Sequence, residues 1–433
     1  MTGGNMRKTR QIILIAIVLL TAVMPLSAGG NDESPKTQKV TIWHCAQGTN
    51  ADVFERIVKN YNDTEGKEKG IEVEAIYQGK ANDVLTSVNA ASGTGNLPDI
   101  AMMDATAAID MNHSKYLVTI DRLGIDTSDI MPCAINSYTS EKGLLALPFN
   151  ASALLLYYNR DIFLGAGLQA PKTLDELIEA AKIIGTEEIA AFAGVPATYE
   201  LTYFIGAQNG LSYMVNNRNG HDGAPTEVLF GKEGTYKAFL EKWKELYDTG
   251  YYNPITSGVT AEFTSGRCAA MLASSSNLAS IMAAVAGEFD AGVAAVPIVN
   301  EDATGGAVIS GGALFAFTDS EAVKTVLEYL VSPTTQIRWS EGTGYVSVNM
   351  KAYDMVEYKA MLWKYGPYKT AADSLLSSNP ELVNVWLPSA YSIYYAFQAN
   401  IADVLNGKDI DTAVDEMVAT VQSALDTYAA QNP

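Results

Sequence analysis

The sequence predicts an α/β fold, in which strands of a sheet alternate with helices that cross over between them. The main evidence is a change of hydrophobic period along the first hundred residues. Residues 71–77 alternate apolar and polar side chains like a strand, whereas 51–61 carry apolar residues at the spacing of one helix face. Two further apolar strand signals, at 40–43 and 99–103, flank these segments and another helical stretch. This strand–helix order is typical of a sheet with crossover helices.

The same reasoning gives the elements of the rest of the chain. A strand signal over 145–158 is interrupted at Pro148–Asn150, and another over 308–317 is broken by Gly311–Gly312. Thr173 and Glu176 form a capping-box pattern that opens a helix ending near Ile184. Further helices are expected at 82–91, 234–247, 274–286, 322–330, 390–405 and 411–428.

The N-terminus has the pattern of a secretory signal peptide. Basic residues precede an apolar run over 12–20, and small residues follow at 25–30. The run is shorter than the roughly 20 residues of a spanning helix, so a membrane anchor is the weaker alternative. A lipoprotein would need a cysteine where Gly29 or Gly30 stands. We therefore expect a signal peptide at 1–28, a polar linker at 29–39, and a soluble periplasmic product.

The composition limits the classes of function. The chain has 433 residues, 48% of them apolar and 18% charged, which indicates a globular protein. A net charge of −20 argues against binding to nucleic acid. Three widely spaced cysteines and three histidines give neither a disulfide scaffold nor a zinc spacing, so no metal or other cofactor is expected. Those six residues are Cys45, Cys133, Cys268, His44, His113 and His221.

No catalytic motif stands out. The nucleophile elbow, the HExxH motif and the P-loop are all absent from the sequence. His44 and Cys45 are adjacent, but neighbours on a strand point to opposite faces, so we expect a structural histidine and a buried cysteine instead of a catalytic pair. A pair of carboxylates for glycoside hydrolysis stays open as an alternative, although nothing in the sequence singles one out.

A different set of residues, small and polar, stands at the ends of the predicted elements. Asp104 follows a strand, Ser152 follows Pro-Phe-Asn, Ser274 begins a helix, and Gly312 lies within a strand. Serine at a helix start can bind a hydroxyl group, and glycine lets the backbone approach a ligand. Aromatic residues that could stack on a sugar follow further along the chain. They are Tyr199, Tyr203, Trp386, Tyr391, Tyr394 and Tyr395.

The order of several short motifs resembles the extracellular solute-binding proteins of ABC importers, family 1, and within it the glycerol-3-phosphate-binding branch. Each motif is short, but together they span nearly the whole mature chain in order. The motifs are Ile42-Trp43-His44, Tyr77-Gln78-Gly79, Gly95 to Asp99, Pro148 to Ser152, Leu156 to Asn159, Phe263 to Ala269, Ala273-Ser274-Ser275, Gly311-Gly312-Ala313, Thr343-Gly344-Tyr345 and Val404 to Lys408.

The resemblance implies two α/β lobes of the type II periplasmic binding protein fold, joined by a hinge, with ligand in the cleft between them. We expect the first lobe at 40–149 plus 307–350 and the second at 150–306 plus 351–433. The chain would cross between lobes near Pro148–Asn150, near Ala307–Gly312 and near Met350. No cofactor is implied.

The family's binding positions carry over where motifs match. They imply a ligand held by Asp104, Ser152, Ser274, the amide of Gly312, and Tyr345. Aromatic stacking is implied at Tyr199 and Tyr394.

Two departures from the branch concern phosphate. Ala81 stands where the branch has a tyrosine, and no arginine or lysine occurs between Leu376 and Val404, where the branch has an arginine. Since arginine is the strong partner of phosphate, a neutral sugar or polyol fits better.

The expected function is therefore the substrate-binding component of an ABC importer. It would capture a carbohydrate or polyol as a monomer and deliver it to a membrane permease. The alternatives are a binder of glycerol-3-phosphate or a glycerophosphodiester that uses Lys80 or Arg267, a secreted carbohydrate-active enzyme, and a sensor that feeds a chemoreceptor.

Overall fold

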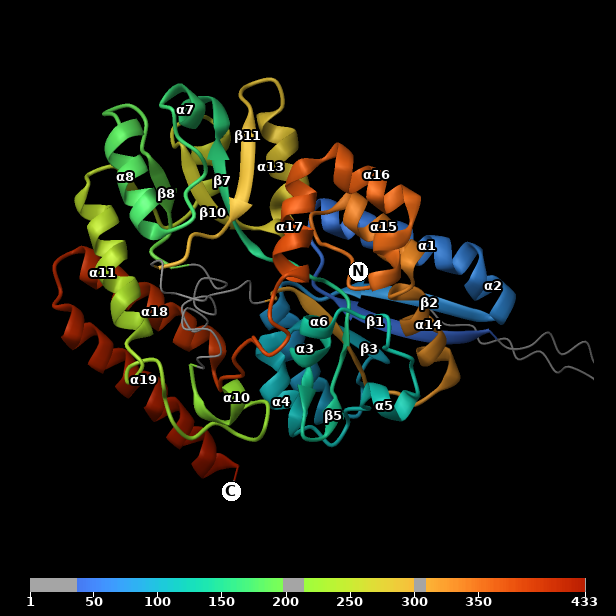
Figure 1. Ribbon diagram of the computed structural model, residues 1–433. Coiled ribbons are helices and arrows are strands. Elements are labelled where there is room, and N and C mark those ends of the chain that lie inside the picture. The colour runs from blue at the N-terminus through green and yellow to red at the C-terminus, as the bar shows by residue number, and fades with distance from the viewer. Residues whose placement is uncertain (1–36, 198–213, 300–308, 433) are drawn as a thin grey trace, which may run out of the picture. The chain divides into compact units, whose positions relative to one another are not determined.

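The computed structural model describes residues 37–197, 214–299 and 309–432, which belong to one unit, Thr37–Pro433 (Figure 1). The expected signal peptide at 1–28, most of the linker at 29–39, and Tyr199 and Tyr203 lie outside the described residues. No helix within the described ranges is long and apolar enough to span a membrane.

The first sheet has five strands in the order β2-β1-β3-β12-β6. Strand β1 pairs in parallel with β2 and β3, while β12 runs antiparallel to β3 and β6. In the β3–β12 pair Gly312 lies opposite Asp104. The strands are β1 (Gln38–His44), β2 (Ile71–Tyr77), β3 (Ile100–Asp104), β6 (Leu147–Pro148) and β12 (Gly312–Ala316).

Helices with one apolar face cover this sheet. Helix α1 buries Val53, Phe54, Ile57, Val58 and Tyr61, which recur at helical spacing. In Figure 1, α1, α2 and α15 lie above β2, whereas α14 lies below it. The helices that cover this sheet are α1 (Thr49–Asp63), α2 (Glu65–Lys69), α3 (Ala81–Ser92), α14 (Glu321–Leu330) and α15 (Pro333–Gly342).

The second sheet also has five strands, in the order β11-β7-β10-β8-β9. Strand β7 is antiparallel to both β10 and β11, and β8 is parallel to β10 and β9. The strands are β7 (Leu154–Asn159), β8 (Phe192–Gly194), β9 (Tyr252–Pro254), β10 (Ala270–Ser274) and β11 (Ala291–Ala295).

Four helices pack around the core of this second half. The indole of Trp243 lies 5.1–5.5 Å, centroid to centroid, from the rings of Phe192, Phe239 and Tyr252. Figure 1 shows α18 and α19 side by side next to α11. The helices are α8 (Leu174–Ile184), α11 (Thr235–Asp248), α18 (Ala390–Leu405) and α19 (Ile410–Gln431).

The chain passes between the two sheets on paired segments. Ser152 and Ser310 exchange two backbone hydrogen bonds of 2.8 Å, and Val346 N donates to Ala151 O at 2.9 Å. The amides of Phe149 and Asn150 both donate to the oxygen of Gly312. These segments lie where the sequence placed its first two crossings, next to the ends of the strands that carry the candidate site residues.

The remaining elements connect these parts. They are η1 (Ala105–Ala107), α4 (Ala108–Asn112), α5 (Ile120–Leu123), α6 (Pro132–Asn136), β4 (Thr139–Ser140), β5 (Gly143–Leu144), α7 (Arg160–Gly165), α10 (Asn216–Gly220), α12 (Val259–Thr264), η2 (Ser275–Asn277), α13 (Leu278–Val285), η3 (Met350–Asp354), α16 (Val356–Lys364) and α17 (Gly366–Leu376).

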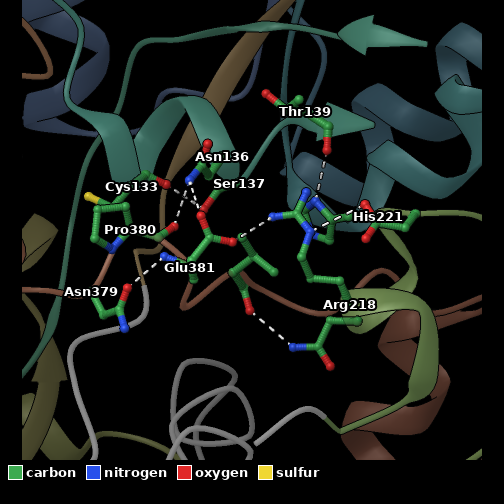
Figure 2. A network of polar contacts seen from close by, with 12 residues as sticks. Cys133, Asn136, Ser137, Thr139, Arg218, His221, Asn379, Pro380 and Glu381 are labelled. Atoms are coloured by element: carbon green, nitrogen blue, oxygen red, sulfur yellow. Dashed lines mark hydrogen bonds and ion pairs between the residues drawn. The ribbon is translucent and has the colours of Figure 1, made fainter. Parts of the chain in front are cut away.

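The α10 segment is a left-handed turn, because Asn217, Arg218 and Asn219 all have φ between 50° and 57°. Non-glycine residues rarely adopt this conformation in a row, so the surroundings must hold it. The side chain of Asn219 accepts from Met214 N and donates to Val383 O. Figure 2 shows Arg218 extending toward Glu381, with 3.7 Å between the charged groups. The turn is thereby fastened to the segment that leads to α18.

Most predicted elements are confirmed, with small shifts at their ends. The prediction of one helix over 274–286 is wrong at its start: Ser274 ends β10, η2 follows, and helix α13 begins only at Leu278. The segment 145–158 is two strands, β6 and β7, which belong to different sheets because the chain crosses between them. Thr173 caps α8 as expected, but Glu176 accepts from Lys172 N instead of from Thr173 N.

Candidate functional site

Asp104 lies at the carboxyl end of β3, the central strand of the first sheet. Its carboxylate caps η1, accepting from the amide of Thr106 at 3.0 Å and also from the Thr106 hydroxyl. It accepts a further hydrogen bond, 2.9 Å long, from the hydroxyl of Tyr391. Burial raises the pKa of Asp104, and the donors from Thr106 and Tyr391 act against that shift. Ligands of open α/β sheets bind at these carboxyl ends.

Tyr391 reaches Asp104 from the first turn of α18, a helix that packs against the second half of the molecule. Burial and the neighbouring carboxylate of Asp104 raise the pKa of Tyr391, so its hydroxyl stays protonated and donates. The contact joins residues 287 positions apart and links a strand of the first sheet to a helix of the second half. The sequence placed Tyr391 in an aromatic cluster but did not assign it to the site.

Tyr138 lies in the same neighbourhood and was missed by the sequence analysis. Its hydroxyl donates to Gly311 O at 3.2 Å. Burial raises the pKa of Tyr138, and Asp104, Tyr345 and Cys45 raise it further by their proximity. Three groups from separate segments of the chain therefore lie near one buried phenol. A tyrosine between a short helix, α6, and a two-residue strand, β4, gives no sequence signal of such a role.

Gly311 and Gly312 lie beside these groups. Gly311 has φ of +119°, and a Cβ atom there would lie 2.1 Å from the oxygen of Asn150, so only glycine fits. Gly312 lies opposite Asp104, and its oxygen accepts from two backbone amides. The sequence predicted that the backbone at this glycine pair comes close to a ligand. In the structure the backbone at this pair packs closely against Phe149 and Asn150, in the segment that crosses between the sheets.

Asn150 is a third residue that the sequence analysis did not assign to the site, after Tyr391 and Tyr138. Its side chain is 8% exposed, and its Oδ1 atom accepts no hydrogen bond from the described residues. A buried carbonyl oxygen without a donor is costly, and a ligand hydroxyl would satisfy it. The Pro148-Phe149-Asn150 motif before Ser152 was the sequence signal that could have identified Asn150 as a site residue.

The structure brings Ser152 and Ser274 close together. Ser275 exchanges hydrogen bonds with Ala153, the residue after Ser152, by its amide and its hydroxyl. Ser274 caps η2 and its hydroxyl accepts from Ser276 N at 3.3 Å. Both Ser152 and Ser274 are buried, at 2% and 8% exposure. Their positions follow from the pairing of β7 with β10.

Two predicted aromatic residues, Tyr345 and Tyr394, lie on different segments of the chain. Tyr345 is half-buried, and its ring stacks on Trp339 with 5.5 Å between centroids and 14° between planes. Tyr394 lies one turn after Tyr391 on α18 and its hydroxyl donates to Ala197 O at 3.3 Å. The third predicted aromatic, Tyr199, lies outside the described residues.

The cations considered for a phosphate ligand differ in availability. Arg267 already binds Glu262 through two hydrogen bonds of 3.0 and 2.7 Å. Lys80 is exposed at the start of α3 and forms no ion pair with any described carboxylate. Of the two, only Lys80 has its charge free.

The chemistry of the cysteines does not favour catalysis. Burial raises the pKa of Cys45 to about 12, so the thiol stays protonated at neutral pH, unlike a catalytic cysteine. Cys45 is half-buried, so the expectation of full burial is wrong. His44 ends β1, as a structural histidine at a strand end; it is buried, and burial lowers its pKa. Within the described residues no group of three His, Cys, Asp or Glu side chains could hold a metal ion.

Comparison with protein families gives a match over most of the chain. Residues 56–363 match the family of bacterial extracellular solute-binding proteins. Similar sequences include the sn-glycerol-3-phosphate-binding periplasmic protein UgpB of Escherichia coli K12 and that of Shigella dysenteriae. Each is 28% identical over 375 residues, covering 82% of this chain and 84% of the relative.

Solved structures show the same fold at low identity. The sugar-binding protein MalE of Xanthomonas citri has a TM-score of 0.75 at 20% identity, covering 90% of this chain and 98% of that protein. UgpB of Mycobacterium tuberculosis in complex with glycerophosphocholine has a TM-score of 0.74 at 20% identity, with coverage of 90% and 99%. The fold is therefore the two-lobed α/β fold of maltose-type periplasmic binding proteins.

Proposed function

Because the chain belongs to the bacterial extracellular solute-binding protein family, we propose that it is the substrate-binding component of an ABC importer. It captures a neutral carbohydrate or polyol and delivers it to a membrane permease. The observation that carries the proposal is the contact of Asp104 with Tyr391, which joins the end of a central strand to a helix of the second half. Side chains that meet at this contact can bind a ligand from both halves of the molecule.

The chemistry around Asp104 favours a ligand without phosphate. A carboxylate accepts hydrogen bonds from sugar hydroxyls, whereas a phosphate group beside it is repelled. At 4 Å and an effective dielectric constant of 20, each pair of like unit charges costs about 4 kcal/mol. The buried Asn150 oxygen adds a second acceptor for a hydroxyl group.

The proposed ligand contacts are those that the sequence implied, with two additions. Asp104, Ser152, Ser274 and the Gly312 amide hydrogen-bond the ligand, and Tyr345 lines the site. Tyr394 and Tyr199 stack on it. To these the geometry adds Tyr391 and Asn150.

The proposed lobes are 40–149 plus 307–350 and 150–306 plus 351–433, with a hinge at the crossings. The division is supported by the strands, since β1, β2, β3, β6 and β12 form one sheet and β7 to β11 the other. Ligand bound between the lobes stabilises a closed form that docks on the permease.

The family is one of exported binding proteins, and its matched relatives are named as periplasmic. We infer for this chain a cleaved signal at 1–28, a soluble periplasmic monomer, and binding without catalysis. The absence of a catalytic motif and the raised pKa of Cys45 support the last point.

A second candidate ligand is glycerol-3-phosphate or a glycerophosphodiester. It is favoured by the 28% identity with proteins named as glycerol-3-phosphate binders. It requires a free cation in the site, and Arg267 is engaged by Glu262. Lys80 would have to supply the charge.

The test is a thermal-shift screen of the mature protein against neutral mono- and oligosaccharides, polyols, glycerol-3-phosphate and glycerophosphocholine. A ligand at 100 times its Kd stabilises the protein by about 2.7 kcal/mol, which raises Tm measurably. We expect a shift with at least one neutral compound. Shifts with the phosphate esters alone would refute the neutral ligand, and conversion of an oligosaccharide to products would refute binding without catalysis.

A matched pair of variants then tests the site. Tyr391→Phe removes only the hydroxyl that binds Asp104, and a loss of affinity of about tenfold or more is expected. Tyr395→Phe makes the same change on the same helix at a residue that is 61% exposed. Equal affinities of the two variants would remove the Asp104–Tyr391 contact from the site.

A further inference from the structure

Residues 382–388 form a connecting segment that leads directly into α18, the helix that carries Tyr391. Every residue of this segment is buried, yet the segment forms neither a helix nor a strand. A buried backbone without secondary structure still needs hydrogen-bond partners, because an unpaired N–H or C=O group is costly away from water. The partners of the connecting segment therefore hold the start of α18 in place.

Those partners lie in the turn at residues 219–221. The oxygen of Val383 accepts from the side-chain amide of Asn219 at 3.1 Å, and the amide of Trp386 donates to the oxygen of Asn219 at 2.9 Å. A Cβ atom on Gly220 would lie 2.9 Å from the oxygen of Trp386, so the two backbones are in close contact. The turn and the connecting segment are thus packed together as one unit.

His221 completes this unit and also contacts the other half of the molecule. Its Nε2 atom lies 2.9 Å from the oxygen of Asn384 in the connecting segment, and its ring stacks on the indole of Trp386. On the other side, Nδ1 lies 3.1 Å from the oxygen of Thr139, which belongs to the proposed first lobe (Figure 2). The side chain is 0% exposed, so bulk water does not compete for these contacts.

Left-handed backbone conformations flank the path from His221 to Tyr391. Among the described residues, those other than glycine with positive φ are Asn217, Arg218, Asn219 and Ser389. The first three precede His221, and Ser389 stands between the connecting segment and the first turn of α18. Such residues persist only where their surroundings determine them, and they gather at functional sites.

We propose that His221 is a positioning residue for the ligand site: it donates its one N–H to the oxygen of Asn384 and so holds the connecting segment where Tyr391 can reach Asp104. This role rests on the proposed function, because it concerns the same Asp104–Tyr391 contact. A neutral imidazole carries one N–H, and the shorter of its two contacts assigns this proton to Nε2. The contact of Nδ1 with Thr139 is then not a hydrogen bond.

The contact between Tyr391 and Asp104 is sensitive to the position of α18. Tyr391 follows Asn384 by seven residues and lies in the first turn of the helix. Its hydroxyl lies 2.9 Å from the Asp104 carboxylate, and a hydrogen bond weakens steeply when its donor is misaligned. A small shift of the connecting segment therefore weakens this contact while α18 stays folded.

Three variants of His221 and one control test the role. His221→Phe keeps a flat ring against Trp386 but has no N–H, whereas His221→Gln keeps a donor near the position of Nε2 and His221→Asn keeps one near Nδ1. Tyr252→Phe is the matched control, because it also removes a buried polar group of the second half. Its hydroxyl contacts the oxygens of Gly194 and Val195, which lie outside the connecting segment.

The first measurement needs no ligand and is a carbon-13 NMR titration of the Asp104 carboxyl. Tyr391 donates to the ionised carboxylate, so loss of this donor raises the pKa of Asp104. We expect this pKa to rise in His221→Phe and His221→Asn as it does in Tyr391→Phe, and to keep the wild-type value in His221→Gln and Tyr252→Phe. An unchanged pKa in His221→Phe, or an equal rise in His221→Gln, would overturn the proposal.

The second measurement is calorimetric titration with the neutral sugar or polyol that gives the largest shift in the thermal screen. We expect His221→Phe and His221→Asn to bind it about fivefold more weakly than the wild-type protein, and His221→Gln and Tyr252→Phe to stay within about twofold. Because His221 acts through Tyr391, the double variant His221→Phe/Tyr391→Phe should bind as tightly as Tyr391→Phe alone. Losses that multiply in the double variant would overturn the proposal.

A further variant serves if His221→Phe does not fold. Asn219→Gly accepts the left-handed φ of 57° and loses only the side-chain bonds of Asn219, including the one to Val383. It should raise the pKa of Asp104 in the same direction, and an unchanged pKa would count against the role of the turn.

Failure of the proposed function gives a different result. If Tyr391→Phe raises the pKa of Asp104 but leaves the affinity unchanged, Asp104 is not the ligand site, although His221 can still position Tyr391. If Tyr391→Phe weakens binding while His221→Phe changes neither quantity, the proposed function stands and the role of His221 is wrong.

Discussion

His221 offers a sharp test of how burial controls charge in this protein. Its side chain is 0% exposed, and its ring stacks on Trp386 with centroids 3.8 Å apart and planes 27° apart. Nδ1 lies 3.1 Å from Thr139 O and Nε2 lies 2.9 Å from Asn384 O (Figure 2). A neutral ring carries one N–H and can donate to only one of these oxygens, whereas a protonated ring could donate to both.

Burial nevertheless prevails and lowers the pKa of His221 to about 4. The two carbonyl oxygens and Asp222 act in the opposite direction, and Arg218 adds to the lowering. An unfolded histidine has a pKa of about 6.5. Between pH 6.5 and 4 the unfolded chain therefore binds more protons at this residue than the folded chain does.

The sign of the pH dependence follows. The contribution of His221 to the free energy of unfolding is complete above about pH 6.5 and is lost progressively as the pH falls to 4. The total loss is about 3 kcal/mol, of which about 2.5 kcal/mol has occurred by pH 4.5. Exposed carboxylates are the same in the wild-type protein and in any variant of His221, so they contribute little to the difference in pH dependence between the two.

The assay is urea unfolding of the wild-type protein and of His221→Gln at pH 7.5, 5.5 and 4.5. Glutamine can still donate to one carbonyl but does not titrate. We expect the wild-type protein to lose about 2.5 kcal/mol more than the variant between pH 7.5 and 4.5. An NMR titration of the imidazole gives a second measurement if the variant folds poorly. Equal pH dependence in both proteins, or a measured pKa near 6.5, would refute the reasoning.

The remaining predictions concern backbone strain, a surface ion pair and a buried amide. Gly311→Ala should lower the free energy of unfolding by more than about 2 kcal/mol, because its Cβ would lie 2.1 Å from a backbone oxygen, whereas Gly407→Ala meets nothing within 4 Å and should cost about 1 kcal/mol. Arg267→Ala should cost under about 1 kcal/mol in urea unfolding and leave ligand affinity unchanged, since its ion pair is exposed; a large loss of affinity would instead support the phosphate-binding alternative. Asn150→Leu should raise the stability of the ligand-free protein by about 1 kcal/mol, because it removes an unpaired buried oxygen, and weaken ligand binding at least tenfold. A variant with unchanged affinity would exclude Asn150 from the site.

The fold could be predicted from the sequence wherever the hydrophobic period was clear. The strand at 71–77 and the helices at 322–330 and 390–405 agree with β2, α14 and α18 within one residue. The error at Ser274 has a physical reason: a serine that ends a strand and caps a short 3₁₀ turn has the same local pattern as a helix N-cap.

The site was harder to predict than the fold, because its residues meet through packing. Asp104 could be selected from its place after a strand, but its partner Tyr391 is 287 residues away, and nothing local distinguishes it from the tyrosines around it. Tyr138 and Asn150 are identified only by burial and by their polar surroundings. Burial and polar surroundings arise only when the two sheets pack in the folded protein, so they cannot be predicted from the local sequence.

The central claim is that a neutral sugar or polyol binds at Asp104 between the two lobes. A crystal structure with the strongest neutral ligand of the thermal screen tests it most directly. We expect a ligand hydroxyl within hydrogen-bond distance, about 2.5–3.0 Å, of the Asp104 carboxylate, with Tyr391 contacting the same ligand. A ligand bound elsewhere, with the Asp104–Tyr391 contact untouched by it, would contradict the account.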